Sequence, residues 1–226
     1  MKISVIGTGK TGSKVVEMLG DNLAYAFDEN NVPTLDKLKT SDAVIIFVPG
    51  DAVSKVLELV IEAGIPAAWG STGFEWPKDL DEKVRSASAK WVLATNFSLG
   101  MNIIRHSIKV ISEGSDILQN PTFKIHEVHH IHKKDAPSGT ALSWKEWLGK
   151  EVDVTSKREG DVNGIHELAV TTEREEITLK HNALDRSIFA EGAIWAAEQL
   201  VNNLTLTVGV HTFGALFDQV MKENNE

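Results

Sequence analysis

A short apolar run followed at once by a glycine motif is the feature that most constrains the fold. Residues 2–6 read KISVI and residues 7–12 read GTGKTG, after which apolar side chains recur at helical spacing up to Gly20. Strand, G-x-G-x-x-G and helix in this order form the dinucleotide-binding fingerprint, in which the glycines allow a tight turn, close approach of a pyrophosphate and packing of helix on strand. The motif predicts cofactor binding by Gly7, Thr8, Gly9, Lys10, Thr11 and Gly12.

An acidic residue ends the next expected strand. Residues 23–27 (LAYAF) lead directly to Asp28, about 20 residues after the first glycine, where an acid bonds the ribose hydroxyls in NAD-binding folds. Asn30 and Asn31 follow, and no arginine or lysine stands close by to receive a 2′-phosphate. The pattern favours NADH over NADPH, and the alternative interpretation of Asp28 is an ordinary turn acid.

Strand and helix patterns then alternate. Residues 42–48 (DAVIIFV) form a continuous apolar run, as in a strand buried on both faces of a parallel sheet, and residues 52–63 have the spacing of an amphipathic helix. Further strands are expected at 65–69 and 91–94, each followed by a polar loop. This alternation predicts a Rossmann-like, doubly wound parallel α/β sheet over the first hundred residues.

The pattern changes from Gly100 onward. Residues 101–111 predict a helix, 153–163 a polar surface loop, and 165–172 with 175–181 an antiparallel pair with one covered face. Helices are expected again at 186–200 and 212–221. We therefore predict a dinucleotide-binding domain at 1–98, rejoined by about 187–226, and a substrate-binding and oligomerisation domain at 99–186 of α+β type with a mixed or antiparallel open sheet.

The chemistry concentrates in residues 127–141, EVHHIHKKDAPSGTA. Taken as a strand of period two, this stretch puts His129 and Lys133 on one face and His130 and His132 on the other. Histidine beside a fixed cation offers a proton donor near neutral pH. A solvated basic strand edge and a metal site are the alternatives, but three histidines at this spacing without cysteine suit zinc poorly, so no metal is predicted.

A turn and a helix start follow. Asp-Ala-Pro-Ser-Gly-Thr at 135–140 is typical of a turn, and the apolar spacing after it predicts a helix that Ser138 or Thr140 would cap. Free N–H groups at such a helix start attract a carboxylate. Together with the histidines, they predict a pocket for a small acidic substrate that must be protonated. Farther along, His166 has two interpretations, a pocket residue and an exposed strand histidine, of which the second is favoured.

Composition narrows the classes of function. The net charge of −9 and pI of 5.4 argue against nucleic acid or an anionic membrane as the main partner, and the absence of cysteine excludes disulfides and thiolate catalysis. The N-terminus enters a strand directly, and no apolar run approaches the ~18 residues that a membrane span needs. These observations predict a cytoplasmic protein.

The chain resembles the 4-hydroxy-tetrahydrodipicolinate reductases, formerly called dihydrodipicolinate reductases, of bacterial diaminopimelate and lysine biosynthesis. Residues 129–141 (HHIHKKDAPSGTA) carry the most specific likeness, and GSTG at 70–73 and ATNFSLG at 94–100 are similar to two further family loops. The glycine loop is one residue shorter than the common family form, and Lys134 stands where an apolar residue is common. The resemblance extends over essentially the whole chain.

This resemblance implies site roles. His129 would be a proton donor or acceptor and Lys133 a proton donor, while His130, Gly139 and Thr140 would hold the carboxylates of a dicarboxylate heterocycle. Further cofactor contacts would come from Gly70, Ser71, Thr72, Ala94, Thr95, Asn96 and Phe97. The implied reaction is reduction to tetrahydrodipicolinate by NADH or NADPH in a homotetramer. Another Rossmann-type oxidoreductase of a small imino or keto dicarboxylate, and a non-enzymatic NAD(H)-binding sensor, are the alternatives.

Overall fold

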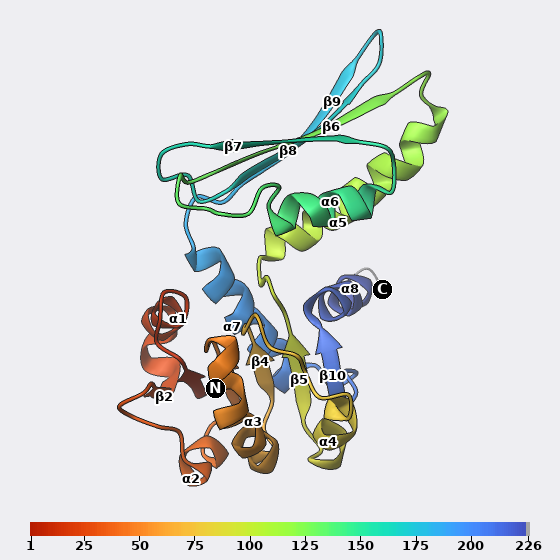
Figure 1. Cartoon of the computed structure of the whole chain (residues 1–226). Helices are drawn as coiled ribbons and strands as arrows, with labels where there is room; N and C mark the ends of the chain where they lie inside the picture. The colour runs from red at the N-terminus through yellow and green to blue at the C-terminus, as the bar shows by residue number, and fades with distance from the viewer. Residues whose placement is uncertain (225–226) are drawn as a thin grey trace. The chain divides into compact units, whose positions relative to one another are not determined.

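The chain divides into two compact units in a computed structural model that describes residues 1–224 (Figure 1). Unit 1 combines Met1–Ser98 with the segment from Ser187 onward, and unit 2 is Leu99–Arg186. Unit 1 is therefore built from both ends of the chain, whereas unit 2 is one continuous insertion.

Unit 1 contains a six-stranded parallel sheet in the order β10-β5-β4-β3-β1-β2. Its strands are β1 (Ile3–Ile6), β2 (Leu23–Phe27), β3 (Ala43–Ile46), β4 (Ala67–Trp69), β5 (Lys90–Leu93) and β10 (Gly209–Thr212). Its α-helices are α1 (Gly12–Leu19), α2 (Leu35–Lys39), α3 (Gly50–Ala63), α4 (Leu80–Ser86), α7 (Ser187–Asn202) and α8 (Phe213–Glu223), with a 3-10 turn at Gly20–Asn22.

The order of these strands creates a switch point. From β1 the chain moves outward to β2 and then returns to β3 on the other side of β1, so that the crossovers run in both directions. α1 packs against α7, and α2 packs against α3. This confirms the doubly wound Rossmann-like sheet. Ligands of open α/β sheets bind at the carboxyl ends of strands beside such a switch point, which here is the end of β1 and β3.

Continuous burial explains why these strands form. All four residues of β1 and of β3 are fully buried, as parallel strands covered by helices on both faces require. The core also holds Trp69 and Trp91, whose rings lie 5.4 Å apart between centroids. The short strand β10 and the helices α2 and α4 were not anticipated from the sequence, because each is too short to show a clear period.

Unit 2 contains a four-stranded mixed sheet in the order β7-β6-β8-β9. The strands are β6 (Thr122–His129), β7 (Asp153–Arg158), β8 (Ile165–Thr171) and β9 (Glu176–Asn182), and the helices are α5 (Leu99–Gly114) and α6 (Gly139–Leu148), with a 3-10 turn at Ser115–Ile117. β6 pairs in parallel with β7 and antiparallel with β8, which pairs antiparallel with β9. The predicted mixed sheet and antiparallel pair are thus confirmed.

One face of this second sheet is covered by α5 and α6. Ile125, Leu168 and Val170 pack there with Trp144 of α6 and Ile108 of α5, and all five side chains are buried. The alternation of residues along β6, in register with β7 and β8, places Glu127 and His129 on that same covered face. On β6, the apolar core residue Ile125 is therefore followed on the same face by the polar residues Glu127 and His129.

Two predictions about the secondary structure of this unit are wrong. The stretch 153–163 is not a loop throughout, because β7 occupies its first half. β7 has one aliphatic residue, Val154, so its sequence shows no apolar alternation, and its pairing with β6 supplies the backbone hydrogen bonds instead. The strand expected to run through Lys133 ends at His129, and residues 131–132 form a turn.

Among residues 1–224, the structure contains no helix that is both long enough and apolar enough to cross a membrane.

Candidate active site

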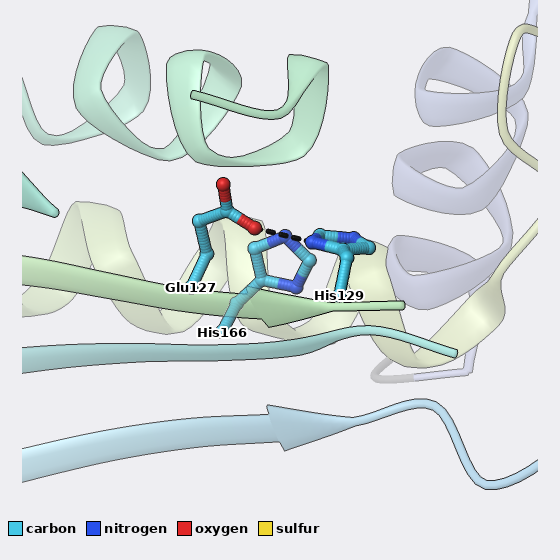
Figure 2. Close-up of side chains that lie close together, drawn as sticks. All are labelled: Glu127, His129 and His166. Carbon is cyan, nitrogen blue, oxygen red and sulfur yellow. Dashed lines mark hydrogen bonds and ion pairs between the residues drawn. The ribbon is translucent and has the colours of Figure 1, made fainter. Parts of the chain in front are cut away.

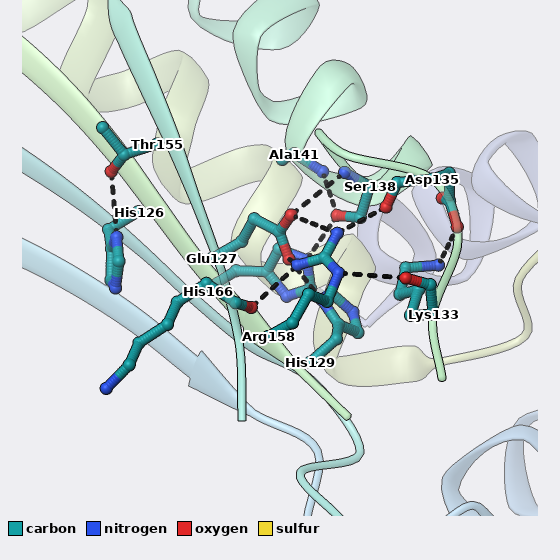
Figure 3. A network of polar contacts seen from close by, with 11 residues as sticks. His126, Glu127, His129, Lys133, Asp135, Ser138, Ala141, Thr155, Arg158 and His166 are labelled. Atoms are coloured by element: carbon teal, nitrogen blue, oxygen red, sulfur yellow. Dashed lines mark hydrogen bonds and ion pairs between the residues drawn. The ribbon is translucent and has the colours of Figure 1, made fainter. Parts of the chain in front are cut away.

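The centre of the candidate site in unit 2 is a buried carboxylate held by a guanidinium. Arg158, the last residue of β7, donates from Nη2 to Oε1 of Glu127 at 2.9 Å and from Nη1 to Oε2 at 3.1 Å (Figure 3). The backbone N–H of Ser138 donates to the same Oε1 at 3.2 Å. The carboxylate is fully buried, so this two-pronged contact compensates for much of its desolvation.

These contacts fix the charge of Glu127. Burial alone would raise the pKa of this carboxyl, but hydrogen bonds from Arg158, Ser156 and His129 outweigh burial and lower the pKa to about 2. Glu127 is consequently an anion throughout the neutral range, and it can only accept hydrogen bonds.

His129 is the next member of the cluster. Its Nδ1 contacts Oε2 of Glu127, the residue two positions earlier on the same strand face (Figure 2). Burial lowers the pKa of His129, the carboxylate of Glu127 acts in the opposite sense, and the cations Lys133 and Arg158 lower the pKa further; the net change is downward. His129 is therefore neutral near pH 7, with an anion on one side of its ring.

His166 lies beside His129. The ring centroids are 5.0 Å apart in an edge-on arrangement, and His166 Nε2 lies 3.1 Å from Oγ of Ser138. Ser138 also caps α6, since its Oγ accepts the N–H of Ala141 at 3.2 Å. His166 Nδ1 is buried and has no hydrogen-bond partner among residues 1–224. Burial is the main cause that lowers the pKa of His166 to about 3, so this ring is neutral.

The turn after β6 brings a second cation to the site. Lys133 lies in this turn, where its N–H donates to the carbonyl of His130 at 3.1 Å. Its ammonium pairs with Asp135 at 2.9 Å, and the Arg158 guanidinium donates to the Lys133 carbonyl at 3.3 Å. The start of α6 at Gly139 and Thr140 follows directly. The arrangement joins a neutral imidazole, an ammonium and a helix N-terminus, which suits proton transfer on a small anion.

Glu127, His129 and His166 also offer three ligand-type atoms within 4.8 Å of one another. Both oxygens of Glu127 are already bound by Arg158, and its Oε2 also contacts Nδ1 of His129. A metal ion would have to compete with a guanidinium for the same carboxylate. The donor set therefore favours proton handling, and the absence of a metal from the reaction stays a prediction.

In unit 1 the predicted cofactor loops pack around Phe47, a residue that was not predicted to belong to the site. A Cβ on Gly7 would lie 2.3 Å from the Phe47 carbonyl oxygen, and one on Gly70 would lie 2.1 Å from its ring. The Phe47 ring is 5.9 Å from that of Phe97. The ends of β1, β3, β4 and β5 are thus brought together.

The glycine motif itself divides into packed and open positions. A Cβ on Gly12 would lie 1.7 Å from the Gly7 carbonyl oxygen, so α1 can approach the end of β1 only because Gly12 lacks a side chain. By contrast, no atom lies within 4 Å of a Cβ built on Gly9. Open space at the N-terminus of α1 fits a pyrophosphate held by backbone N–H groups.

Two further predicted cofactor residues have suitable geometry. Asp28 follows β2, and its Oδ1 accepts the N–H groups of Asn30 and Asn31 at 2.8 and 3.0 Å, which fixes the carboxylate at the edge of the sheet. The Ser71 hydroxyl is buried without a hydrogen-bond partner among the described residues. An orphaned hydroxyl in a glycine loop fits a group that a bound ligand would satisfy.

A family model and curated relatives agree about this chain. The model of the C-terminal part of dihydrodipicolinate reductase matches residues 100–213. A 4-hydroxy-tetrahydrodipicolinate reductase from Bdellovibrio bacteriovorus is 32% identical over 211 residues, which cover 89% of this chain and 90% of the relative. The chain belongs to the dihydrodipicolinate reductase family. Another reductase of that name, from Haloarcula marismortui, is 31% identical and covers 96% of this chain and 99% of its own.

Solved structures confirm the fold of the family. The dipicolinate-bound dihydrodipicolinate reductase from Paenisporosarcina sp. TG-14 superimposes with a TM-score of 0.72 at 18% identity, covering 96% of this chain and 98% of the other. Aspartate semialdehyde dehydrogenase II from Vibrio cholerae gives a TM-score of 0.56 at 12% identity, and the match covers 90% of this chain and 99% of the other. At these identities the likeness concerns the fold alone.

The structure corrects the geometry expected around the family's histidine stretch. His130 lies just beyond the end of β6, so it does not share a strand face with His132, and Lys133 reaches the site from a turn. His166 is buried at 3% exposure, whereas an exposed strand histidine was expected. Phe97 is also buried, so its side chain packs in the core, and the residue can offer a ligand only its backbone.

Sequence reasoning missed Glu127 and Arg158. A signal for Glu127 was present, because a residue two positions before His129 shares its strand face. Arg158 carried no such signal, since the polar stretch around it has no apolar period. Both residues are charged, and charged residues are rarely buried unless paired.

Proposed function

We propose that this protein reduces 4-hydroxy-tetrahydrodipicolinate to tetrahydrodipicolinate in diaminopimelate and lysine biosynthesis, with a reduced nicotinamide dinucleotide as the reductant. The observation that carries the proposal is the cluster of His129, Lys133 and the N-terminus of α6, found in a chain whose relatives bear the name of this reductase. The heterocycle loses its hydroxyl together with one ring hydrogen as water, and one hydride and one proton are added to the ring.

The chain's own groups have distinct tasks in this proposal. When bound, the nicotinamide supplies the hydride. His130 and the N–H groups of Gly139 and Thr140 hold the substrate carboxylates, for which a helix start is suited. The Lys133 ammonium donates a proton as charge builds on the ring, and neutral His129 accepts or relays one.

We further propose NADH as the preferred cofactor. The Asp28 carboxylate at the end of β2 would bond the ribose hydroxyls and repel a 2′-phosphate. The nearest following cation in the sequence is Lys37, whose ammonium lies 5.5 Å from the Tyr25 ring centroid. A homotetramer in the cytoplasm stays a prediction.

The direct test is the loss of reduced-nicotinamide absorbance with purified protein and freshly condensed pyruvate and aspartate semialdehyde. Substrate-dependent oxidation, faster with NADH than with NADPH, is expected. A folded protein that oxidises neither cofactor with this substrate, but oxidises one with another imino or keto dicarboxylate, would contradict the substrate. Cofactor binding without any turnover would favour the sensor alternative.

A further inference from the structure

The contacts of Glu127 determine which nitrogen of His129 carries a proton. Oε1 accepts from the Ser138 N–H and from Arg158, and Oε2 accepts from Arg158 as well. An ionised carboxylate has no proton to donate, so its contact with Nδ1 of His129 requires that Nδ1 be the donor. In a neutral ring, the second nitrogen, Nε2, then carries a free lone pair.

The surroundings of Nε2 agree with an accessible acceptor. No hydrogen bond to Nε2 is made by another residue within the described range 1–224. Gly164, just before β8, provides room beside it, because a Cβ there would lie 3.0 Å from Nε2 and 3.7 Å from Cε1 of His166. One nitrogen of the ring is thus anchored and the other is kept clear.

We propose that Glu127, clamped by Arg158, is a positioning residue that fixes His129 as the Nδ1–H tautomer and so makes Nε2 the nitrogen that meets the substrate. This inference rests on the proposed function only for the identity of the ligand. Glu127 does not touch the reacting atoms; it acts through His129, as the aspartate of a Ser-His-Asp triad acts through its histidine.

Glu127→Gln changes the proton position while it preserves the shape of the side chain. The amide oxygen should keep the Ser138 N–H and Arg158 Nη2 as donors, which leaves the amide NH₂ facing Nδ1 of His129 and costs the hydrogen bond from Arg158 Nη1 to Oε2. Nδ1 must then accept, and the ring proton moves to Nε2. The variant should therefore hold substrate nearly as well as the wild type but lose turnover.

The experiment combines spectroscopy with kinetics on the full-length protein. Two-bond ¹⁵N–¹H spectra of protein labelled with [¹⁵N]histidine distinguish the two tautomers, and the His129→Gln spectrum assigns the His129 signals by subtraction. The wild type should show Nδ1–H with an unprotonated Nε2 near neutral pH, and Glu127→Gln should show the reverse. We expect kcat to fall about 10²- to 10⁴-fold, because a His129 ring held in the wrong tautomer loses the contribution of an acid–base residue, with KM little changed.

Glu167→Gln is the matched control, because it removes a carboxylate of the same sheet that pairs with Lys180 at 3.4 Å and lies opposite His126 in the β6–β8 register. It should change neither the His129 tautomer nor kcat. An Nε2–H ring or an imidazolium in the wild type would overturn the proposal, even if Glu127→Gln does not fold. A folded Glu127→Gln with wild-type kcat would also overturn it. A wild type without turnover would contradict the reductase assignment, whereas its spectrum would still decide the tautomer.

Discussion

The two units prepare for their ligands by opposite means. In unit 1 the candidate cofactor loops owe their shape to missing side chains, since Gly7 and Gly12 let backbone pack on backbone and Gly9 leaves space. In unit 2 the candidate site is made of charged side chains, above all the buried Glu127 and the partly buried Arg158, on the covered face of a sheet. Unit 1 should therefore be sensitive to added atoms, and unit 2 to lost functional groups.

The largest effect should come from His129→Gln, which removes the proton-handling group of unit 2 and leaves unit 1 unaltered. Turnover should fall roughly 10²- to 10⁴-fold, the usual contribution of an acid–base residue. NADH affinity, measured by calorimetry, should stay within error of the wild type. His132→Gln, at an exposed turn position, is the control and should retain turnover. Full activity of His129→Gln would refute the role of this histidine.

Two substitutions in unit 1 should distinguish a glycine needed for packing, Gly12, from a glycine that borders open space, Gly9. Gly12→Ala places a methyl against the Gly7 carbonyl, so it should lower the free energy of unfolding by roughly 1–3 kcal/mol, as overpacking does. Gly9→Ala meets no atom within 4 Å and should leave the unfolding midpoint unchanged while it weakens NADH binding. Thermal unfolding and calorimetry measure the two effects. Equal NADH affinity in Gly9→Ala and the wild type would exclude close pyrophosphate approach at this position.

The stability of the protein should also depend on pH, because unit 2 contains buried histidines. The pKa of His166 is about 3 in the folded protein, against an ordinary value of 6.5. Below pH 6.5 the unfolded chain therefore binds a proton at this residue, whereas the folded chain does not. Stability should fall from pH 7 to pH 5 by roughly 2 kcal/mol from this group, with His129 and His181 adding in the same direction. Glu127, whose pKa is lowered from 4.5 to about 2, stabilises the fold fully above its ordinary pKa, and this contribution is lost mainly as the pH falls from about 4.5 to 2, below this window.

Urea unfolding at the two pH values checks this dependence. In His166→Gln, the difference in unfolding free energy between pH 7 and pH 5 should be smaller than in the wild type by about 2 kcal/mol. In His132→Gln, this difference should equal that of the wild type. An unchanged pH dependence in His166→Gln would mean that His166 is protonated in the folded state.

The smallest of these effects concerns a glycine of unit 2, which tests whether added atoms also matter there. Gly164→Ala brings a methyl to 3.0 Å from Nε2 of His129, so the ring must shift and the approach to it narrows. We expect kcat/KM to fall on the order of tenfold, since small misplacements of reacting groups are costly. Gly114→Ala, at the end of α5 with no atom within 4 Å, is the control. Equal kcat/KM for both variants would place the substrate away from Nε2.

Unit 1 was predictable because its signals are local and periodic. The apolar run at β3 and the glycine motif before α1 each determine a backbone form within about ten residues, and the structure contains both. The parts that were missed, such as β10, are stabilised by neighbours distant in the chain: β10 pairs with β5. Four residues of strand carry too little pattern to be recognised alone.

Unit 2 was less predictable because its site contradicts the usual burial preferences. Glu127, Arg158 and His166 would each be placed on the surface by residue type, yet Glu127 and His166 are buried and Arg158 is partly buried. Glu127 is tolerated inside because Arg158 pairs with it, and His166 because its ring stays neutral and packs beside His129. The sequence does indicate the histidine stretch and a helix cap at Ser138 or Thr140, since those depend on spacing, and the structure has the cap at Ser138. The partners that come from β7 depend on a pairing that no local pattern reveals.

The division of unit 1 between the two ends of the chain has a consequence for synthesis. When residue 186 has left the ribosome, unit 2 is complete, whereas unit 1 still lacks the helix α7, which packs on α1, β3, β4 and β5, and the edge strand β10. The second unit in the chain is thus the first whose residues are all available. During translation, when about four-fifths of the chain has been made, all residues of unit 2 are present but unit 1 is still incomplete.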